Sequence, residues 1–253
     1  MDRISVVIIA KNEAAHITAA VTSGLLVSTD IIVVDSGSTD GTKQLAEAAG
    51  ARVIPVLWQG FGNARNTGAA AASRDNILNL DADELITPGL AAELRTLELE
   101  DKVVYGFRRK NFIGEKEVRN GEWGNDTVYR VYNRNYHGWT HDKVHEQINA
   151  VKANRKKIGG AILHYTTSDL HQYSKKLDTY ATLSAEKFYE AGKKVGAAKP
   201  VLSATFSFIK NYLFRLGFLD GKTGFDLAWM HTRYNWNKYQ KLRHLCHEDA
   251  GKK

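Results

Sequence analysis

Two aspartates flank one small residue at Asp81-Ala82-Asp83, directly after the mainly apolar run 77–80. Two carboxylates at this spacing can bind a divalent cation and contact a bound nucleotide at the same time. Mg²⁺ and Mn²⁺ prefer oxygen ligands and keep coordination positions for water and substrate phosphates. An Asp-x-Asp triplet also occurs by chance in solvated acidic turns. Its position at the carboxyl end of an expected strand favours a metal and diphosphate site.

A further carboxylate, Asp35, follows the apolar run 31–34 and begins a stretch of small and hydroxyl-bearing residues that reaches Gly41. A carboxylate in this position can accept a hydrogen bond from a nucleobase N–H and so orient the base. The same stretch also has the composition of a turn in which Ser or Asp caps the next helix. The two roles are compatible, and the residues alone leave both open.

The elements that would position these carboxylates are predicted by an alternation of short β-branched apolar runs with segments of helical spacing. This order is typical of right-handed βαβ units and a parallel sheet. Ligands of such sheets bind beyond the carboxyl ends of the strands, here Lys11–Glu13, Asp35–Gly41 and Asp81–Glu84. We expect strands at 4–10, 31–34, 52–56 and 76–80, with helices at 13–26, 42–49 and 63–72.

After Pro88 the pattern changes, and strands are expected at 103–109, 127–134 and 161–165. A polar loop is expected over 110–126. From Asp169 onward the spacing indicates basic helices. Phe225, Trp229, Trp236 and Tyr239 share one helical face. A second set of apolar residues also shares a face: Leu202, Phe206, Ile209, Leu213 and Leu216.

Composition limits the class of protein. Hydrophobic residues make up 43% and charged residues 25%, as in ordinary globular domains. The single cysteine, Cys246, excludes an internal disulfide framework and fits a reducing compartment. Lys11–Glu13 interrupts the first apolar run, so no secretory signal is expected, and no run approaches the roughly 18 residues of a membrane span. We expect a cytoplasmic protein, or one peripheral to the inner membrane.

The formal net charge of +7 would attract nucleic acid, anionic lipid or phosphorylated substrates. The basic residues form no recognisable nucleic-acid motif, so we expect no nucleic-acid partner.

Four motifs, in order along the first third of the chain, resemble those of family 2 glycosyltransferases: Ser5–Glu13, Ile31–Thr42, Ala64–Gly68 and Leu80–Glu84. The resemblance implies an inverting enzyme of the GT-A fold. This is an α/β fold with a Rossmann-like nucleotide-binding half around a mostly parallel sheet, and an acceptor-binding half. On this basis we expect a catalytic domain at 1–168, with halves at 1–88 and 89–168, and a basic helical region at 169–253.

Two later segments, Lys143–Glu146 and Gly217–Gly224, are similar to bacterial lipopolysaccharide-core glucosyltransferases. In that branch UDP-glucose is the usual donor and an inner-core sugar the acceptor. The Gln-x-x-Arg-Trp signature of processive synthases is absent, so single transfers are expected.

The resemblance also implies roles for single residues. Ala10 and Glu13 would line the nucleotide pocket, and Asp35 would hold the uracil. Arg65 would lie near the diphosphate, and Asp81 would contact the ribose or the donor sugar.

Asp83 would be the direct ligand of Mg²⁺ or Mn²⁺. His164 follows the apolar run 161–163, where related folds sometimes supply a further metal ligand. A hydrogen-bonded structural histidine is the alternative there. A divalent ion together with Arg65 would stabilise the charge that develops on departing UDP.

An inverting transfer needs a base for the acceptor hydroxyl, and a carboxylate suits that role. Glu146 is the candidate, because it matches the family's expected position. Asp142 is its rival, and an ordinary surface glutamate is the third interpretation. The aromatic, basic C-terminal helices could contact a membrane surface through anionic head groups, or pack on the parent domain instead.

Other function classes fit less well. A dinucleotide-dependent oxidoreductase would carry Gly-x-Gly-x-x-Gly after the first strand, where this chain has Lys11-Asn12-Glu13-Ala14-Ala15-His16. A nucleotidyltransferase would carry a glycine-rich basic loop there. A glycosyltransferase of another glycoconjugate, such as capsule or glycolipid, stays open, as does a non-catalytic carbohydrate-binding module.

Overall fold

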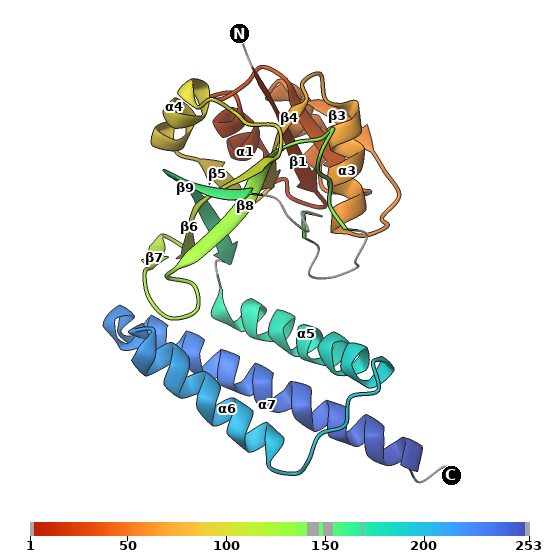
Figure 1. The fold of residues 1–253 in the computed structure, drawn as a ribbon, viewed down its shortest axis with the longest axis vertical. Coiled ribbons are helices and arrows are strands. Elements are labelled where there is room, and N and C mark those ends of the chain that lie inside the picture. The colour runs from red at the N-terminus through yellow and green to blue at the C-terminus, as the bar shows by residue number, and fades with distance from the viewer. Residues whose placement is uncertain (1–2, 141–146, 149–153, 168, 251–253) are drawn as a thin grey trace. The chain divides into compact units, whose positions relative to one another are not determined.

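The computed structural model describes residues 3–140, 147–148, 154–167 and 169–250. The chain divides into two compact units (Figure 1). Residues up to 109 and 127–164 form the first unit, whereas 110–126 and 165–253 form the second. Among the residues described, no helix is both long enough and apolar enough to cross a membrane.

Four parallel strands in the order β3-β2-β1-β4 begin the sheet of the first unit. They confirm the expected parallel βαβ arrangement, with strand ends that differ from the expected ones by at most one residue. The first helix was expected over 13–26 and is shorter, Ile17–Gly24. The strands are β1 (Ile4–Ala10), β2 (Ile31–Asp35), β3 (Arg52–Pro55) and β4 (Asn76–Asp81). The helices between them are α1 (Ile17–Gly24), α2 (Thr42–Ala48) and α3 (Phe61–Ala71).

Strand β1 is buried along its whole length, which explains its continuous apolarity. Its side chains alternate between two cores, one on each face of the sheet. Val6 and Ile8 pack with residues of α1, α2 and α4 (Pro88–Thr96). Val7 and Ile9 pack with alanines of α3 on the opposite face. The parallel strands are therefore held from both sides, and their carboxyl ends form a firm edge.

Beyond β4 the sheet contains antiparallel pairs of strands. Strand β8 (Asp126–Asn133) pairs antiparallel with β4. The order then continues through β6 (Val103–Ile113) and β9 (Asn154–Thr167) to β5 (Glu84–Ile86), which pairs antiparallel with β9. The three strands expected after Pro88 are confirmed: β6 and β9 extend beyond their expected bounds, and β8 begins and ends one residue earlier than expected. Neither β5 nor α4 was expected.

The second unit contains the expected C-terminal helices. Helices α5 and α6 both pack along α7 (Figure 1). Their bounds are α5 (Leu170–Glu190), α6 (Lys199–Phe208) and α7 (Lys222–Ala250). Between α6 and α7 lie a π-helical turn, η1 (Ile209–Phe214), and a 3₁₀ turn, η2 (Gly217–Asp220).

The expectation of a polar loop over 110–126 was partly wrong. Strand β6 continues to Ile113 and pairs antiparallel with β7 (Lys116–Val118). Gly114, with φ of +54°, permits the tight turn between them. The hairpin was not predicted because its paired segments, 111–113 and 116–118, have only three residues each and show no clear period.

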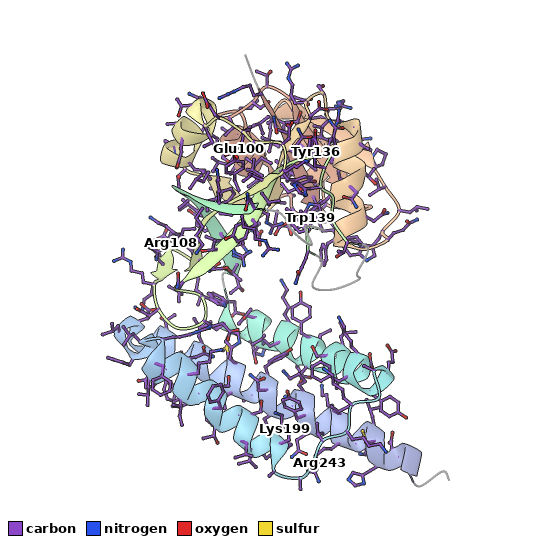
Figure 2. The ribbon with its side chains drawn as sticks, viewed as in Figure 1. Glu100, Arg108, Tyr136, Trp139, Lys199 and Arg243 are labelled. Atoms are coloured by element: carbon purple, nitrogen blue, oxygen red, sulfur yellow. The ribbon has the colours of Figure 1, made fainter. Side chains whose placement is uncertain are left out.

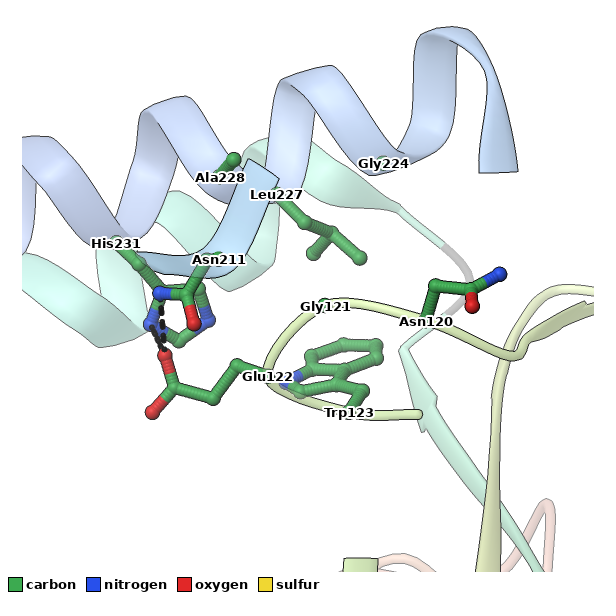
Figure 3. Close-up of a pocket in the computed structure, with 9 residues that line it drawn as sticks. All are labelled: Asn120, Gly121, Glu122, Trp123, Asn211, Gly224, Leu227, Ala228 and His231. Atoms are coloured by element: carbon green, nitrogen blue, oxygen red, sulfur yellow. Dashed lines mark hydrogen bonds and ion pairs between the residues drawn. The ribbon is translucent and has the colours of Figure 1, made fainter. Parts of the chain in front are cut away.

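The loop after β7 packs against η1 and α7 around a small pocket (Figure 3). Glu122 Oε2 lies 3.1 Å from His231 Nδ1 and accepts a hydrogen bond from Asn211 Nδ2 at 3.2 Å. Tyr173 Oη lies 3.3 Å from the other ring nitrogen of His231. These contacts bind the loop to helices that follow it by about a hundred residues.

Candidate active site

The register of the parallel strands brings three of the predicted site residues to one edge. Ala10 pairs with Asp35 across β1 and β2, and Ile9 pairs with Asp81 across β1 and β4. The carboxyl ends of β2, β1 and β4 are therefore level. Ala10 and Asp35 are 6% and 5% exposed, so both are largely enclosed by the sheet and its loops.

The loops after β1 and β2 are fastened to each other. Asn12 Oδ1 accepts a hydrogen bond from Thr39 N at 2.8 Å, and Asn12 N donates to Ser38 Oγ at 2.9 Å. Asn12 has φ of +57°, a left-handed conformation that asparagine tolerates better than most residues. Glu13, which is half-buried, donates its backbone N–H to Thr42 Oγ1 at 2.8 Å. The two loops thus form one wall at the edge of the sheet.

Asp35 makes hydrogen bonds within the turn that follows β2, and this turn was one of the two roles left open for it from the sequence. Its oxygens accept from Ser38 N at 3.3 and 3.1 Å, and Oδ1 also accepts from the Ser38 hydroxyl. An ionised carboxylate offers about four acceptor positions. The contacts to Ser38 therefore leave room for a further donor, and contact with a nucleobase stays a prediction.

Asp81 lies between two arginines. Arg65 Nη2 is 2.5 Å from Asp81 Oδ1, and Arg130 Nη2 is 2.9 Å from Asp81 Oδ2. The side chains of Arg65 and Arg130 are only 3% and 8% exposed. Burial alone would raise the pKa of Asp81, but the guanidiniums of Arg130 and Arg65 hold it well below its usual range. Asp81 is therefore ionised, and each of its oxygens already faces a cation.

Glu84 extends this cluster inward. Its side chain is fully buried, with Oε1 lying 3.2 Å from Arg109 Nη1 and 3.8 Å from Arg130 Nη2. Oε2 accepts a hydrogen bond from Asp81 N at 2.9 Å. Burial and the nearby charge of Asp81 raise the pKa of Glu84, against the opposing effect of Arg130 and Arg109. We call these two acids and three arginines the arginine–acid network.

Trp139, labelled in Figure 2, contacts two arginines of the network. The guanidinium carbons of Arg65 and Arg130 lie 4.5 and 5.5 Å from the centroid of its ring, which are cation–π distances. Its indole Nε1 donates to Asn79 Oδ1 at 2.7 Å. Its backbone N and O both bond to the side-chain amide of Asn66, each at 2.9 Å. Both arginines therefore rest on a tryptophan that is itself fixed at three atoms.

Asp83 and His164, the predicted metal ligands, lie together. His164 Nε2 is 3.3 Å from Asp83 Oδ2, and the side chains of His164 and Asp83 are 13% and 27% exposed. The pairing of β5 with β9 sets Glu84 opposite His164 and so brings the histidine beside Asp83. A carboxylate oxygen and an imidazole nitrogen are donors that a divalent ion accepts, so the pair fits such an ion.

No group of three or more His, Cys, Asp or Glu suited to a metal occurs within the described part of the chain. A divalent ion at Asp83 and His164 could also take water and substrate phosphates as ligands. The same two residues also form a structural contact, so ligation by His164 stays a prediction.

Glu146 and its rival Asp142 lie outside the described residues, and the structure does not place the predicted base. Sequence reasoning also missed Arg109, Arg130 and Trp139. The two arginines lie in strands that were expected. They lie near Asp81 and Glu84 because of how the strands pair, and local sequence patterns do not predict this pairing.

Comparison with known proteins places this geometry in context. Residues 5–163 match the family model described as glycosyl transferase family 2. An "uncharacterized glycosyltransferase" of Rickettsia bellii (strain RML369-C) is 28% identical, over 96% of this chain and 87% of the relative. LpsC of Rhizobium meliloti (strain 1021), described as a lipopolysaccharide core biosynthesis glycosyltransferase, is 28% identical over 90% of this chain and 89% of LpsC.

Among solved structures, glucosyl-3-phosphoglycerate synthase from Mycobacterium tuberculosis, in complex with Mg²⁺ and UDP, is 31% identical over 43% of each chain, with a TM-score of 0.35. That overlap is too small to inform on the fold or the ligands of this chain.

Proposed function

Because the chain belongs to glycosyl transferase family 2, whose model matches residues 5–163, we propose that it transfers a hexose from a UDP-sugar to a lipopolysaccharide-core acceptor. UDP-glucose is the proposed donor, and a hydroxyl of an inner-core sugar is the proposed acceptor. Similarity to LpsC along 90% of this chain supports the choice of acceptor class. The three motifs that reach the carboxyl ends of β1, β2 and β4, together with the motif in α3, support a nucleotide-sugar donor.

The observation that carries the proposal is the different environment of the two aspartates. Asp81 faces Arg65 and Arg130 at 2.5 and 2.9 Å, whereas Asp83 faces a histidine at 3.3 Å. A cation bound by Asp81 would have to displace or repel two buried guanidiniums. Among the residues that the structure describes, no arginine pairs with Asp83. We therefore propose that Asp83 binds the metal and that Asp81 orients the ribose or the donor sugar.

Each residue then has one proposed part in the transfer. Ala10, Glu13 and Asp35 would bind the nucleoside, and Arg65 would face the diphosphate. Asp83, together with His164, would hold Mg²⁺ or Mn²⁺, which supplies positive charge against the leaving UDP.

Glu146 would accept the proton of the acceptor hydroxyl. The acceptor oxygen bonds to the anomeric carbon as the bond from that carbon to UDP breaks, which inverts the configuration. Near-normal turnover of a folded Glu146→Gln variant would reject this base.

UDP release from a panel of UDP-sugars tests the proposal, with Mn²⁺, Mg²⁺ or EDTA added and with core-lipopolysaccharide acceptors present or absent. We expect metal-dependent release with one donor and loss of at least about a hundredfold in Asp83→Ala. Asp75→Ala is the matched control, because Asp75 is an exposed aspartate paired with Arg134. No release with any donor or acceptor would favour the non-catalytic carbohydrate-binding alternative.

Metal affinity is measured separately from turnover. His164→Ala should weaken Mn²⁺ binding, and unchanged affinity would remove His164 from the ligand set. Transfer to a capsular or other glycolipid acceptor, with none to lipopolysaccharide core, would keep the enzyme class and replace the acceptor.

A further inference from the structure

Helix α6 and the turns after it expose large apolar side chains. Leu202, Phe206 and Phe214 are 64%, 62% and 76% exposed. We define the apolar face by six residues of α6, η1 and η2 that are all exposed: Leu202, Phe206, Leu213, Phe214, Phe218 and Leu219. Single exposed apolar residues are common on proteins, but a gathered set indicates an interaction surface.

The inward side of the same segment carries small or polar residues. Ala204, Ser207 and Asn211 are buried, and Ser207 Oγ accepts a hydrogen bond from Asn235 Nδ2 of α7 at 3.0 Å. A surface helix of a globular protein normally buries its large apolar residues and exposes its polar ones. This segment does the reverse, so its outward side is suited to apolar surroundings.

Aromatic contacts join the parts of this surface. Phe208 stacks on Tyr212, with ring centroids 5.2 Å apart. Tyr212 also contacts Phe218 at 6.3 Å and Phe225 at 5.7 Å. Residues of α6, η1, η2 and the start of α7 are thereby packed into one surface.

The charge of the segment indicates what covers the face. Residues 191–219 contain five basic side chains and no Asp or Glu. Two of the cations, Lys199 at the start of α6 (Figure 2) and Arg215 after η1, are exposed, and Lys210 is half-buried. Long basic side chains reach the head groups of anionic lipids while their stems cover apolar surface.

A second copy of the chain fits this surface poorly. In a symmetric dimer the same patch occurs on both sides of the interface. The cations of 191–219 would then face identical cations, and that segment supplies no acid to offset them. An anionic bilayer offers both an apolar layer and the opposite charge.

We propose that the apolar face lies in the interfacial layer of an anionic phospholipid bilayer, with Lys199, Lys210 and Arg215 directed to the lipid phosphates. The chain would lie on the bilayer through this surface. The inference does not depend on the proposed donor or acceptor, because it rests on the second unit alone. Vesicle binding and UDP release therefore fail or succeed independently.

Sedimentation of the full chain with vesicles tests the apolar contribution. Wild type should bind phosphatidylcholine vesicles that contain phosphatidylglycerol, and bind pure phosphatidylcholine weakly. Phe206→Ser with Leu213→Ser should lower the partition coefficient about tenfold or more, because two large side chains no longer enter the apolar layer. Leu45→Ser with Leu57→Ser is the matched control, since both leucines are exposed in the first unit.

The ionic contribution is tested in the same assay at low salt. Lys199→Gln and Lys210→Gln should each weaken binding about fivefold. Lys43→Gln removes one charge from α2 and should weaken vesicle binding less. The comparison shows whether binding depends on the local cations or only on the net charge of the protein. Circular dichroism and UDP release without lipid should match wild type in all these variants, because none of the substituted residues lies in the candidate site.

Three results would overturn the proposal. The first is a folded wild type that does not bind anionic vesicles at low salt. The second is a Phe206→Ser, Leu213→Ser double variant that binds these vesicles as strongly as the control double variant does. The third is a wild type that does not bind vesicles but forms a dimer in light scattering, where the double variant is monomeric. That result would assign the apolar face to contact with a second copy of the chain.

Discussion

Asp81 keeps its negative charge between guanidiniums that solvent barely reaches. Water cannot hydrate Arg65 and Arg130 well there, so the carboxylate replaces hydration that both cations have lost. The buried Glu84 also lies near one of these cations, with its Oε1 3.8 Å from Arg130 Nη2. Trp139 limits how far either arginine can move. The network therefore serves stability and the geometry of the site at once.

Replacing Asp81 by asparagine should lower the free energy of unfolding by about 2–3 kcal/mol, because two buried cations lose a counter-charge. Urea denaturation at neutral pH measures this loss. The pKa of Asp81 is depressed, so its stabilisation is complete above the ordinary aspartate pKa and is lost as pH falls through the depressed value. Asp75→Asn, whose side chain is 55% exposed, should cost less than about 1 kcal/mol. Equal losses in the two variants would contradict the argument.

His231 gives the second unit a dependence on pH. Burial lowers its pKa despite the attraction of Glu122, and Arg215 adds to the lowering. Between the lowered value and the ordinary value of about 6.5, the unfolded chain binds more protons than the folded chain. Stability should therefore fall as the pH drops below about 6.5, and His231→Gln should flatten this slope. Denaturation curves across that range check it, with His244→Gln, at an exposed position of the same helix, as the control for replacing a histidine.

Asp81 and Asp83 could be singled out from sequence because a strand end, an acidic pair and three companion motifs coincide there. Arg130 and Trp139 could not be. Arg130 reaches Asp81 only because β8 lies antiparallel beside β4, and Trp139 is placed by bonds to Asn66, which lies 73 residues earlier. Contacts of that kind follow from tertiary pairing, which leaves no local pattern.

At the scale of elements, continuous apolarity made the first four strands predictable. Strand β5 has three residues, begins with a glutamate and shows no usable period. Its pairing with β9 makes it a strand. That pairing also brings His164 beside Asp83. The least visible element in the sequence thus determines part of the predicted metal site.

Helix α3 is set against the sheet by a glycine. A Cβ on Gly68 would lie 2.3 Å from Val7 Cγ1 and 2.8 Å from Val34 Cγ2, so the helix or the strands would have to move. Gly68→Ala should cost about 1–3 kcal/mol of stability and shift Arg65, one turn earlier, away from Asp81. Thermal unfolding and UDP release measure the two effects.

Gly89→Ala is the control for this change, because Gly89 is also helical and a Cβ there meets nothing within 4 Å. It should leave release unchanged and stabilise by up to about 1 kcal/mol. A Gly68→Ala variant that behaves like Gly89→Ala would show that α3 is free to adjust.

At the scale of the whole molecule, the second unit joins segments about a hundred residues apart. The carboxylate of Asp220 accepts from Arg119 N at 3.2 Å, from Asn120 N at 2.8 Å and from Asn120 Nδ2 at 3.1 Å. Lys116 Nζ donates to Asp220 O at 3.2 Å. The loop 119–124 thus depends on the turn before α7, which a division of the sequence at residue 168 would not reveal.

Asp220→Asn should loosen this junction, because an amide can present only one acceptor oxygen to the three donors that the carboxylate satisfies. We expect a loss of about 1–3 kcal/mol and faster amide exchange at Arg119 and Asn120. Asp226→Asn is the matched control, since within the described residues Asp226 forms an ion pair only with the exposed Lys222. This substitution should cost under about 0.5 kcal/mol. Hydrogen exchange read by peptide mass spectrometry distinguishes the two. Unchanged exchange over 116–124 in Asp220→Asn would mean that the hairpin and its loop hold their conformation without the helices, and that the second unit is less integrated than its hydrogen bonds indicate.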